Sequence, residues 1–261
     1  MQDPEKTALI TPDPLPDPEW EFPEPPTDLV FDDGEPLESN RHRIAMNVLI
    51  DSVLQAFPDR EDIFTGGNMF VYYSREQAMN RDFRGPDFFA VTDVDSAKER
   101  QGWVVWEEQG RYPDVIVEFM SPSTKRVDKI TKKELYARTF RTFTYVIYDP
   151  FDPSSLEGWQ LQGREYVPLE PNELGRLWCE PLDLWLGLWE GRLRREPATG
   201  TCEWLRFFDA DGNLILLLDE VAEQERQRAD AEQQRANAER QRADRLAERL
   251  RALGVDPDAD E

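Results

Sequence analysis

The feature that most limits the fold is a strand-like run that is almost entirely apolar and contains one buried-type carboxylate. The run is PDVIVEFM, residues 113–120, and its inner acid is Glu118. Dense Val and Ile without polar alternation are typical of strands that are buried on both faces in α/β proteins. An unpaired carboxylate there would cost several kcal/mol or would take up a proton. The sequence therefore predicts an α/β core in which a metal ion, or a lysine from a neighbouring helix, compensates Glu118.

The segments around this run have the patterns of a mixed sheet flanked by helices. A helix is predicted over residues 41–57, with Asn40 as a candidate N-cap, and a second over 127–139. FPDRED (57–62) and TGGN (65–68) have turn composition. The expected strands cover 69–74, 87–94, 113–120 and 144–150. The order of these elements favours an α/β fold with a mixed central sheet.

The two ends of the chain differ from this core. Residues 1–39 form an acidic Pro-rich arm, with nine prolines in the first 40 positions, and are expected to be extended and flexible, with apolar anchors such as Leu29 and Val30. Residues 40–218 are predicted to be one domain, with a β-rich extension from about residue 157. Residues 219–253 predict a long charged helix, and 254–261 an acidic tail.

The predicted C-terminal helix repeats every seven residues, but its apolar seam is mostly alanine. The repeat consists of Ala222, Ala229, Ala236, Ala243 and Leu250. Such a weak seam leaves three alternatives open: a coiled coil that could form a homodimer, a solvated single helix, or a helix packed on its own domain.

Composition excludes several classes of protein. The longest apolar runs are about five residues, whereas a membrane span needs about 20. The first residues lack the pattern of a secretory signal, and two cysteines are too few for a disulfide framework, so a cytoplasmic protein is expected. A net charge of −23 argues against a general polyanion binder. Residues 41–150, however, carry 17 acidic and 16 basic side chains, so a local anion site is allowed.

A second acid, Asp87, opens the predicted strand over 87–94. Asp87 and Glu118 are therefore two carboxylates on apolar strands of one predicted sheet. Hard oxygen ligands of this kind suit Mg²⁺ or Mn²⁺. A structural ion pair with a lysine or an arginine is the alternative.

The run from Pro113 to Pro150 resembles the Uma family of restriction-endonuclease-like proteins, a branch of the PD-(D/E)XK nuclease superfamily. The resemblance rests on the Glu118-x-x-Ser-Pro-Ser segment, on Asp128 and Lys132 four residues apart, on Tyr136 four residues further, and on the upstream Pro-Asp at 86–87. It covers residues 85–150 closely and the flanking segments loosely, and the acidic arm adds nothing to it. It implies a restriction-endonuclease-like fold, with the long C-terminal helix that many members also have.

The resemblance implies a role for each matching position. Asp87 and Glu118 would hold Mg²⁺ or Mn²⁺, with the carbonyl of Phe119 as a further candidate ligand. The superfamily lysine two positions after the second acid is Met120 here, and the matching lysine is Lys132 on the following helix. Residues 128, 132 and 136 lie along one helix face, which supports this choice over the neighbouring lysines. Asp128 and Tyr136 would support the site.

Other residues in this region have simpler alternatives. Asp114 lies four strand positions from Glu118, about 13 Å away, which is too far to share one ion. Ser121, Ser123 and Thr124 are candidate phosphate contacts, although Ser-Pro-Ser-Thr is also a helix-capping sequence. His42, the one histidine, either lines the site or caps a helix.

Two functions of different classes follow. The first is a metal-dependent endonuclease that hydrolyses phosphodiester bonds of nucleic acid, with DNA expected, leaving the 5′-phosphate and 3′-hydroxyl that the superfamily implies. The second is a non-catalytic interaction protein that keeps the fold and acts through its C-terminal helix. An acidic surface favours the second, and the set of two acids and a helix lysine favours the first.

Overall fold

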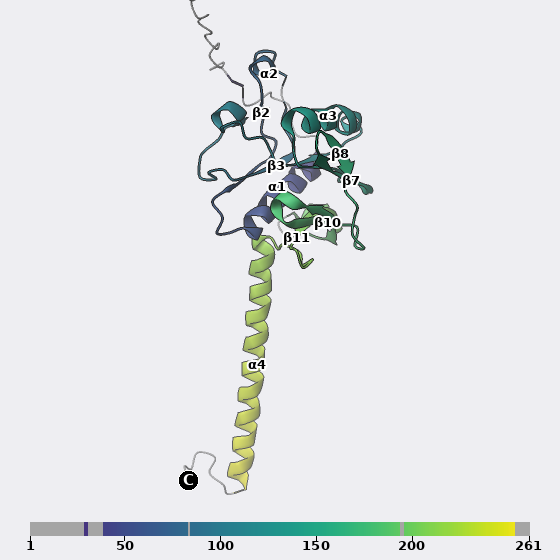
Figure 1. The fold of residues 1–261 in the computed structure, drawn as a ribbon. Coiled ribbons are helices and arrows are strands. Elements are labelled where there is room, and N and C mark those ends of the chain that lie inside the picture. The colour runs from purple at the N-terminus through teal and green to yellow at the C-terminus, as the bar shows by residue number, and fades with distance from the viewer. Residues whose placement is uncertain (1–28, 31–38, 83, 194–195, 254–261) are drawn as a thin grey trace, which may run out of the picture.

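The computed structural model describes residues 29–30, 39–82, 84–193 and 196–253 (Figure 1). The expectations for most of the acidic arm and for the acidic tail lie outside these residues. The anchor expected at Leu29 and Val30 is present, because Leu29 packs against Phe70 and Tyr72 and the Val30 N–H donates to the Tyr72 hydroxyl at 3.1 Å.

A six-stranded mixed sheet forms the centre of the domain, which confirms the predicted α/β class. Its strand order is β1-β3-β5-β6-β7-β8. Neighbouring strands are antiparallel except for β5 and β6, which are parallel. The strands are β1 (Ile63–Gly66), β3 (Phe88–Thr92), β5 (Val115–Phe119), β6 (Thr144–Asp149), β7 (Asp152–Gln162) and β8 (Glu165–Pro168).

Strand β5 is buried along its whole length, as its apolar composition predicts. Its side chains alternate between two cores, because successive residues of a strand point to opposite faces. Val115, Val117 and Phe119 belong to one core, and Ile116 belongs to the other. Glu118 therefore shares the face of Ile116.

Helix α1 (Asn40–Ala56) covers the face of Val117. The predicted helix is confirmed, but its N-cap is Ser39 and not Asn40. The Ser39 side chain accepts a hydrogen bond from the His42 N–H at 3.3 Å, which satisfies one free donor of the first turn.

A continuous helical segment over residues 127–140 covers the opposite face, the face of Glu118. It contains α3 (Lys133–Leu135) between two π-helical stretches, Val127–Lys132 and Tyr136–Phe140. Hydrogen bonds of the i→i+5 type widen the turn beyond 3.6 residues. Side chains four residues apart therefore stay in line along this segment, which we call the 127–140 helix.

The β-rich extension is divided between two sheets. Strands β7 and β8 complete the central sheet, and β9, β10 and β11 form a separate antiparallel sheet in the order β11-β10-β9. Gly158 of β7 lies against Leu177 of β9, where an added Cβ would come within 2.7 Å of the Leu177 side chain. The three strands are β9 (Leu177–Cys179), β10 (Leu184–Gly191) and β11 (Cys202–Phe208).

Several short elements were not predicted. β1 lies where the sequence indicated turns. This four-residue edge strand was not predicted, because the Asp and Gly residues around it have turn composition. The predicted strand over 69–74 is not part of the central sheet: β2 (Val71–Tyr72) pairs in parallel with β4 (Trp103–Val104). The remaining short helices are α2 (Arg75–Met79) and the 3₁₀ turns Val105–Glu107, Glu180–Leu182 and Pro197–Thr199.

The long C-terminal helix, α4 (Leu218–Ala252), projects away from the domain as a single rod (Figure 1). None of its side chains is buried. In the described part of the chain, no helix combines the length and the apolar character that a membrane crossing requires.

Candidate functional site

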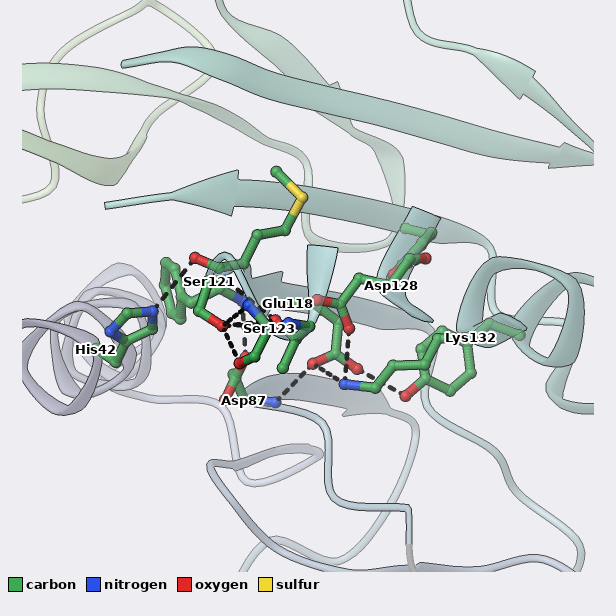
Figure 2. A network of polar contacts seen from close by, with 12 residues as sticks. His42, Asp87, Glu118, Ser121, Ser123, Asp128 and Lys132 are labelled. Carbon is green, nitrogen blue, oxygen red and sulfur yellow. Dashed lines mark hydrogen bonds and ion pairs between the residues drawn. The ribbon is translucent and has the colours of Figure 1, made fainter. Parts of the chain in front are cut away.

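The candidate site lies between β3, β5 and the 127–140 helix, where three carboxylates gather around one lysine (Figure 2). The carboxylates belong to Asp87, Glu118 and Asp128, and the lysine is Lys132. We call these four residues the carboxylate–lysine cluster. Glu118 and Asp128 are 0% and 1% exposed.

The sheet register brings the two strand acids together. In the antiparallel pair β3–β5, Phe88 lies opposite Val117, so Asp87, directly before β3, comes next to Glu118. The Asp87 N–H donates to Glu118 Oε2 at 3.4 Å, and the Phe119 N–H donates to Asp87 Oδ2 at 2.7 Å. These contacts fix both carboxylates at the end of the paired strands.

The helix supplies the rest of the cluster from one face. Lys132 Nζ lies 2.9 Å from Glu118 Oε2 and 2.9 Å from Asp128 Oδ1. The Tyr136 hydroxyl donates to Glu118 Oε1 at 2.7 Å. The spacing of 128, 132 and 136 in the sequence thus corresponds to one face that contacts the sheet, and the π-helical turns keep it aligned.

The electrostatics of the cluster are unbalanced. Burial and the charge of Glu118 raise the pKa of Asp87 well above its ordinary value, against the opposite effect of Lys132. Burial also raises the pKa of Asp128. Burial alone would lower the pKa of Lys132, but Glu118, Asp128 and Asp87 raise it, so this ammonium stays charged. One permanent cation faces three carboxyl groups.

A divalent cation fits this donor set as a partial site. Carboxylate oxygens are hard ligands, and a second cation would relieve the crowding that raises the pKa of Asp87. Among the described residues, however, no three His, Cys, Asp or Glu side chains gather closely enough to hold a metal ion by themselves. Two carboxylates would therefore need a backbone carbonyl and water to complete the coordination.

The Ser-Pro-Ser-Thr loop caps the helical segment that follows it. The Ser121 hydroxyl accepts from the N–H groups of Ser123 and Thr124, both at 3.2 Å, and Pro122 lies in the turn that leads into the helix. Ser121 is buried and Ser123 is exposed. The capping alternative from the sequence is therefore observed, and Ser123 remains the hydroxyl on the solvent side.

His42 and Asp114 lie outside the cluster. His42 is buried; its ring nitrogens lie 2.7 Å from Ser39 Oγ and 3.3 Å from the Met120 carbonyl oxygen. Asp114 accepts hydrogen bonds from the N–H and the hydroxyl of Thr92 and pairs with Arg111. His42 thus connects helix α1 to the loop that starts at Met120, and Asp114 fixes the β3 end.

Several other residues with reactive or stacking side chains have packing roles. Tyr72 is buried against Phe70 and Trp106, and Tyr73 packs on Phe140. Cys179 is a buried free thiol, and burial raises its pKa to about 12. Sequence reasoning missed the contact of Tyr145, whose hydroxyl donates to the Asp128 carbonyl at 2.9 Å, because its strand pattern indicated only a core residue.

A mixed sheet with two neighbouring strand acids, covered by a helix that supplies a lysine, places the protein in the restriction-endonuclease-like class. The chain belongs to the Uma2 family, because the family model described as "Putative restriction endonuclease" matches residues 18–194. The match is wider than the expected 85–150 and includes the second half of the acidic arm, contrary to the sequence-based expectation that the arm adds nothing. Helix α4 lies beyond it.

One similar solved structure is titled as a "putative nuclease belonging to DUF820 from Anabaena variabilis ATCC 29413". It is 17% identical in sequence, with a TM-score of 0.37, over 58% of this chain and 83% of that chain. No curated protein matches the chain.

Proposed function

We propose that the protein is a metal-dependent endonuclease that hydrolyses phosphodiester bonds of nucleic acid, with DNA as its substrate and Mg²⁺ or Mn²⁺ as its cofactor. The observation that carries this proposal is the excess of carboxylates around Lys132. A structural ion pair needs one carboxylate for one ammonium, and an apolar core would be at least as stable. Three carboxyl groups around one ammonium are better explained by a second, exchangeable cation.

Each residue of the cluster has a role in this proposal. Asp87 and Glu118 would hold the metal, with the carbonyl of Phe119 as a further ligand. When bound, the metal would supply Lewis acidity to the phosphate and lower the pKa of a water molecule. Lys132 remains protonated and offsets negative charge that develops on the phosphate.

The surrounding groups keep these side chains in place. Asp128 holds the ammonium of Lys132 together with Glu118, and Tyr136 holds the second oxygen of Glu118. Ser123, exposed at the start of the helical segment, is a candidate phosphate contact together with Ser121. Removing Asp128 or Tyr136 should therefore weaken catalysis by misplacing Lys132 or Glu118.

Calorimetric titration with Mn²⁺, followed by plasmid nicking on the same samples, tests the proposal. Asp87→Asn and Glu118→Gln should abolish Mn²⁺ binding and nicking. Asp114→Asn is the matched control, since Asp114 is close to Glu118 in the sequence but contacts Thr92 and Arg111. This variant should keep both Mn²⁺ binding and nicking. Lys132→Arg should keep the fold and the positive charge. It should reduce nicking about 100-fold or more, because the guanidinium places this charge differently relative to the phosphate.

Absence of Mn²⁺ binding by the wild-type protein would contradict the proposal and make the cluster structural. The second candidate function, a non-catalytic interaction protein, would then be favoured. The observation behind it is helix α4, which has a seven-residue repeat from Ala222 to Leu250 and no buried side chain. A repeat of seven suits pairing with another helix better than an isolated helix of 3.6 residues per turn.

We also propose that α4 pairs two copies of the chain as a coiled coil. Leu246, Leu250 and Leu253 are exposed at its far end and would form the apolar part of the seam. Two copies would bring two active sites together, as cleavage of both DNA strands requires. The molar mass of the protein by light scattering distinguishes one copy from two.

A further inference from the structure

Next to the face that holds Asp128 and Lys132, the 127–140 helix presents a face of basic residues. Lys129, Lys133 and Arg138 line a pocket of about 320 Å³ together with Arg164 and Tyr166 of the β7–β8 hairpin. A neighbouring pocket of about 450 Å³ is lined by Arg138, Arg141, Arg164 and Glu165. We call the second one the arginine pocket. Neither pocket contains a residue of the carboxylate–lysine cluster.

Two of the three arginines of this pocket, Arg141 and Arg164, are not neutralised by a carboxylate of the described residues. Arg141 ends the helix in a left-handed conformation, with φ of 57°, and donates to the Gly163 carbonyl at 3.2 Å. Among the described residues, neither Arg141 nor Arg164 has a carboxylate within ion-pair distance. Arg138 pairs with Glu134, but both side chains are more than 60% exposed, so solvent screens the pair.

The local charge is opposite to that of the whole chain. Five cations, Lys129, Lys133, Arg138, Arg141 and Arg164, surround the two pockets, with three carboxylates beside them, Glu134, Glu157 and Glu165. The chain as a whole carries −23. An acidic surface repels a polyanion, so a polyanion would approach through the basic face.

We infer that the arginine pocket binds a backbone phosphate of the nucleic acid, on one side of the bond cleaved at the carboxylate–lysine cluster. This inference rests on the proposed function for the position of the cleaved bond. Guanidinium groups bind phosphate oxygens in a bidentate manner, and three of them converge on one pocket. A phosphodiester backbone that follows the helix would reach both places.

The dimensions agree with a short step along the backbone. Lys132 and Arg138 are six residues apart, which is about 9 Å along an α-helix at 1.5 Å per residue and less where the turns are π-helical. Phosphates of one strand of duplex DNA advance about 3.4 Å per base pair along the axis. Measured along the helix axis, this separation corresponds to about three nucleotides at most.

The test is the salt dependence of DNA binding by fluorescence anisotropy, with a labelled 20-base-pair duplex in the presence of EDTA. EDTA prevents cleavage and removes any contribution of a metal. In Arg141→Ala/Arg164→Ala, affinity should fall about tenfold or more, and the slope of log K against log salt should become shallower by about 1, the change expected for one lost phosphate contact. Glu165→Gln should tighten binding, because it removes a carboxylate from the same pocket.

Arg228→Ala/Arg235→Ala is the matched control, since both arginines are exposed on α4, and it should leave affinity and slope unchanged. An unchanged slope in Arg141→Ala/Arg164→Ala, or a wild-type protein that does not bind the duplex, would overturn the inference. Failure of the proposed function would give a different result. DNA binding with the expected change in slope, but without Mn²⁺-dependent nicking in any sample, would support the phosphate site in the arginine pocket and contradict the nuclease proposal.

Discussion

The carboxylate–lysine cluster and helix α4 are built from the same kinds of side chain, but the first is buried under a helix and the second lies in solvent. The cluster contains four charged residues, two of which are at most 1% exposed. Helix α4 contains nine acidic residues and eight arginines in 35 positions, and none is buried. Charges in the cluster interact through a medium of low polarity, whereas those on α4 are screened by water and salt.

This difference shows why residue type alone does not indicate function. Replacing an exposed Glu on α4 should change the stability of the protein little, because an exposed ion pair contributes about 0 to 1 kcal/mol. Glu118 changes the pKa of Asp87 and of Lys132, because it is buried next to both. The comparison can be tested by removing single charges from each region.

The largest effect is expected for Lys132→Met. This variant removes the ammonium that pairs with both Glu118 and Asp128 and leaves two buried carboxylates without their cation. Breaking a buried pair from one side should reduce the free energy of unfolding by about 4 kcal/mol at pH 7, as measured in urea. The loss should shrink in acid, where the carboxyl groups take up protons.

Arg138→Met is the exposed counterpart on the same helix. Its pair with Glu134 is screened, so the free energy of unfolding should change by less than about 0.5 kcal/mol. Similar values for the two variants would mean that the cluster is more hydrated than its burial indicates.

The next effect concerns the first turn of α4, where a charged residue of this helix contacts a buried charge of the domain. Arg206 of β11 is 0% exposed, and its Nη2 lies 2.8 Å from Glu220 Oε2 in the first turn of α4. Glu220→Ala should reduce the free energy of unfolding by about 3 kcal/mol, because it leaves a buried guanidinium without its carboxylate. Glu232→Ala, further along α4, should change it by less than about 0.5 kcal/mol. Equal changes for Glu220→Ala and Glu232→Ala would mean that the contact between Arg206 and Glu220 does not stabilise the domain.

The sequence predicted the cluster better than the sheet around it. Glu118 could be found because one acid interrupts an apolar strand, and Lys132 because its spacing from Asp128 and Tyr136 follows one helix face. The pairing of Asp87 with Glu118 needed the resemblance to a nuclease family, since strand register is not visible in a single sequence. No sequence pattern indicates the contact between Arg206 and Glu220, because it depends on how β11 and α4 pack against each other.

The errors in the fold have physical causes of the same kind. β1 is a short edge strand, and its sequence differs little from a turn. The π-helical turns of the 127–140 helix arise from packing on the sheet and have no local signal. Strand β8 and most of β7 lie in the predicted β-rich extension of the domain, and their place in the central sheet could not be predicted, because a strand sequence does not indicate which sheet the strand joins.

The smallest effect, and the one with the opposite sign, is expected for Asp87→Asn. Burial and Glu118 raise the pKa of Asp87 in the folded protein, so the folded state binds this proton more tightly than the unfolded state. Stability of the wild type is therefore lost as pH rises from the ordinary pKa of an aspartate through the raised one. An asparagine keeps an oxygen for the Phe119 N–H and offers an N–H₂ to Glu118, without the charge. The variant should be more stable than the wild type by about 1 kcal/mol at neutral pH, and this gain should vanish in acid.

Thermal unfolding of both proteins across this pH range, with and without Mn²⁺, measures the effect. Mn²⁺ should stabilise the wild type, because a ligand that binds only the folded state adds RT ln(1 + [L]/Kd) to its stability. It should not stabilise Asp87→Asn. A variant that is less stable than the wild type at neutral pH would mean that Asp87 is needed for the fold. A variant that is more stable and is not stabilised further by Mn²⁺ would mean that the Asp87 carboxylate serves to bind a cation and reduces the stability of the protein without one.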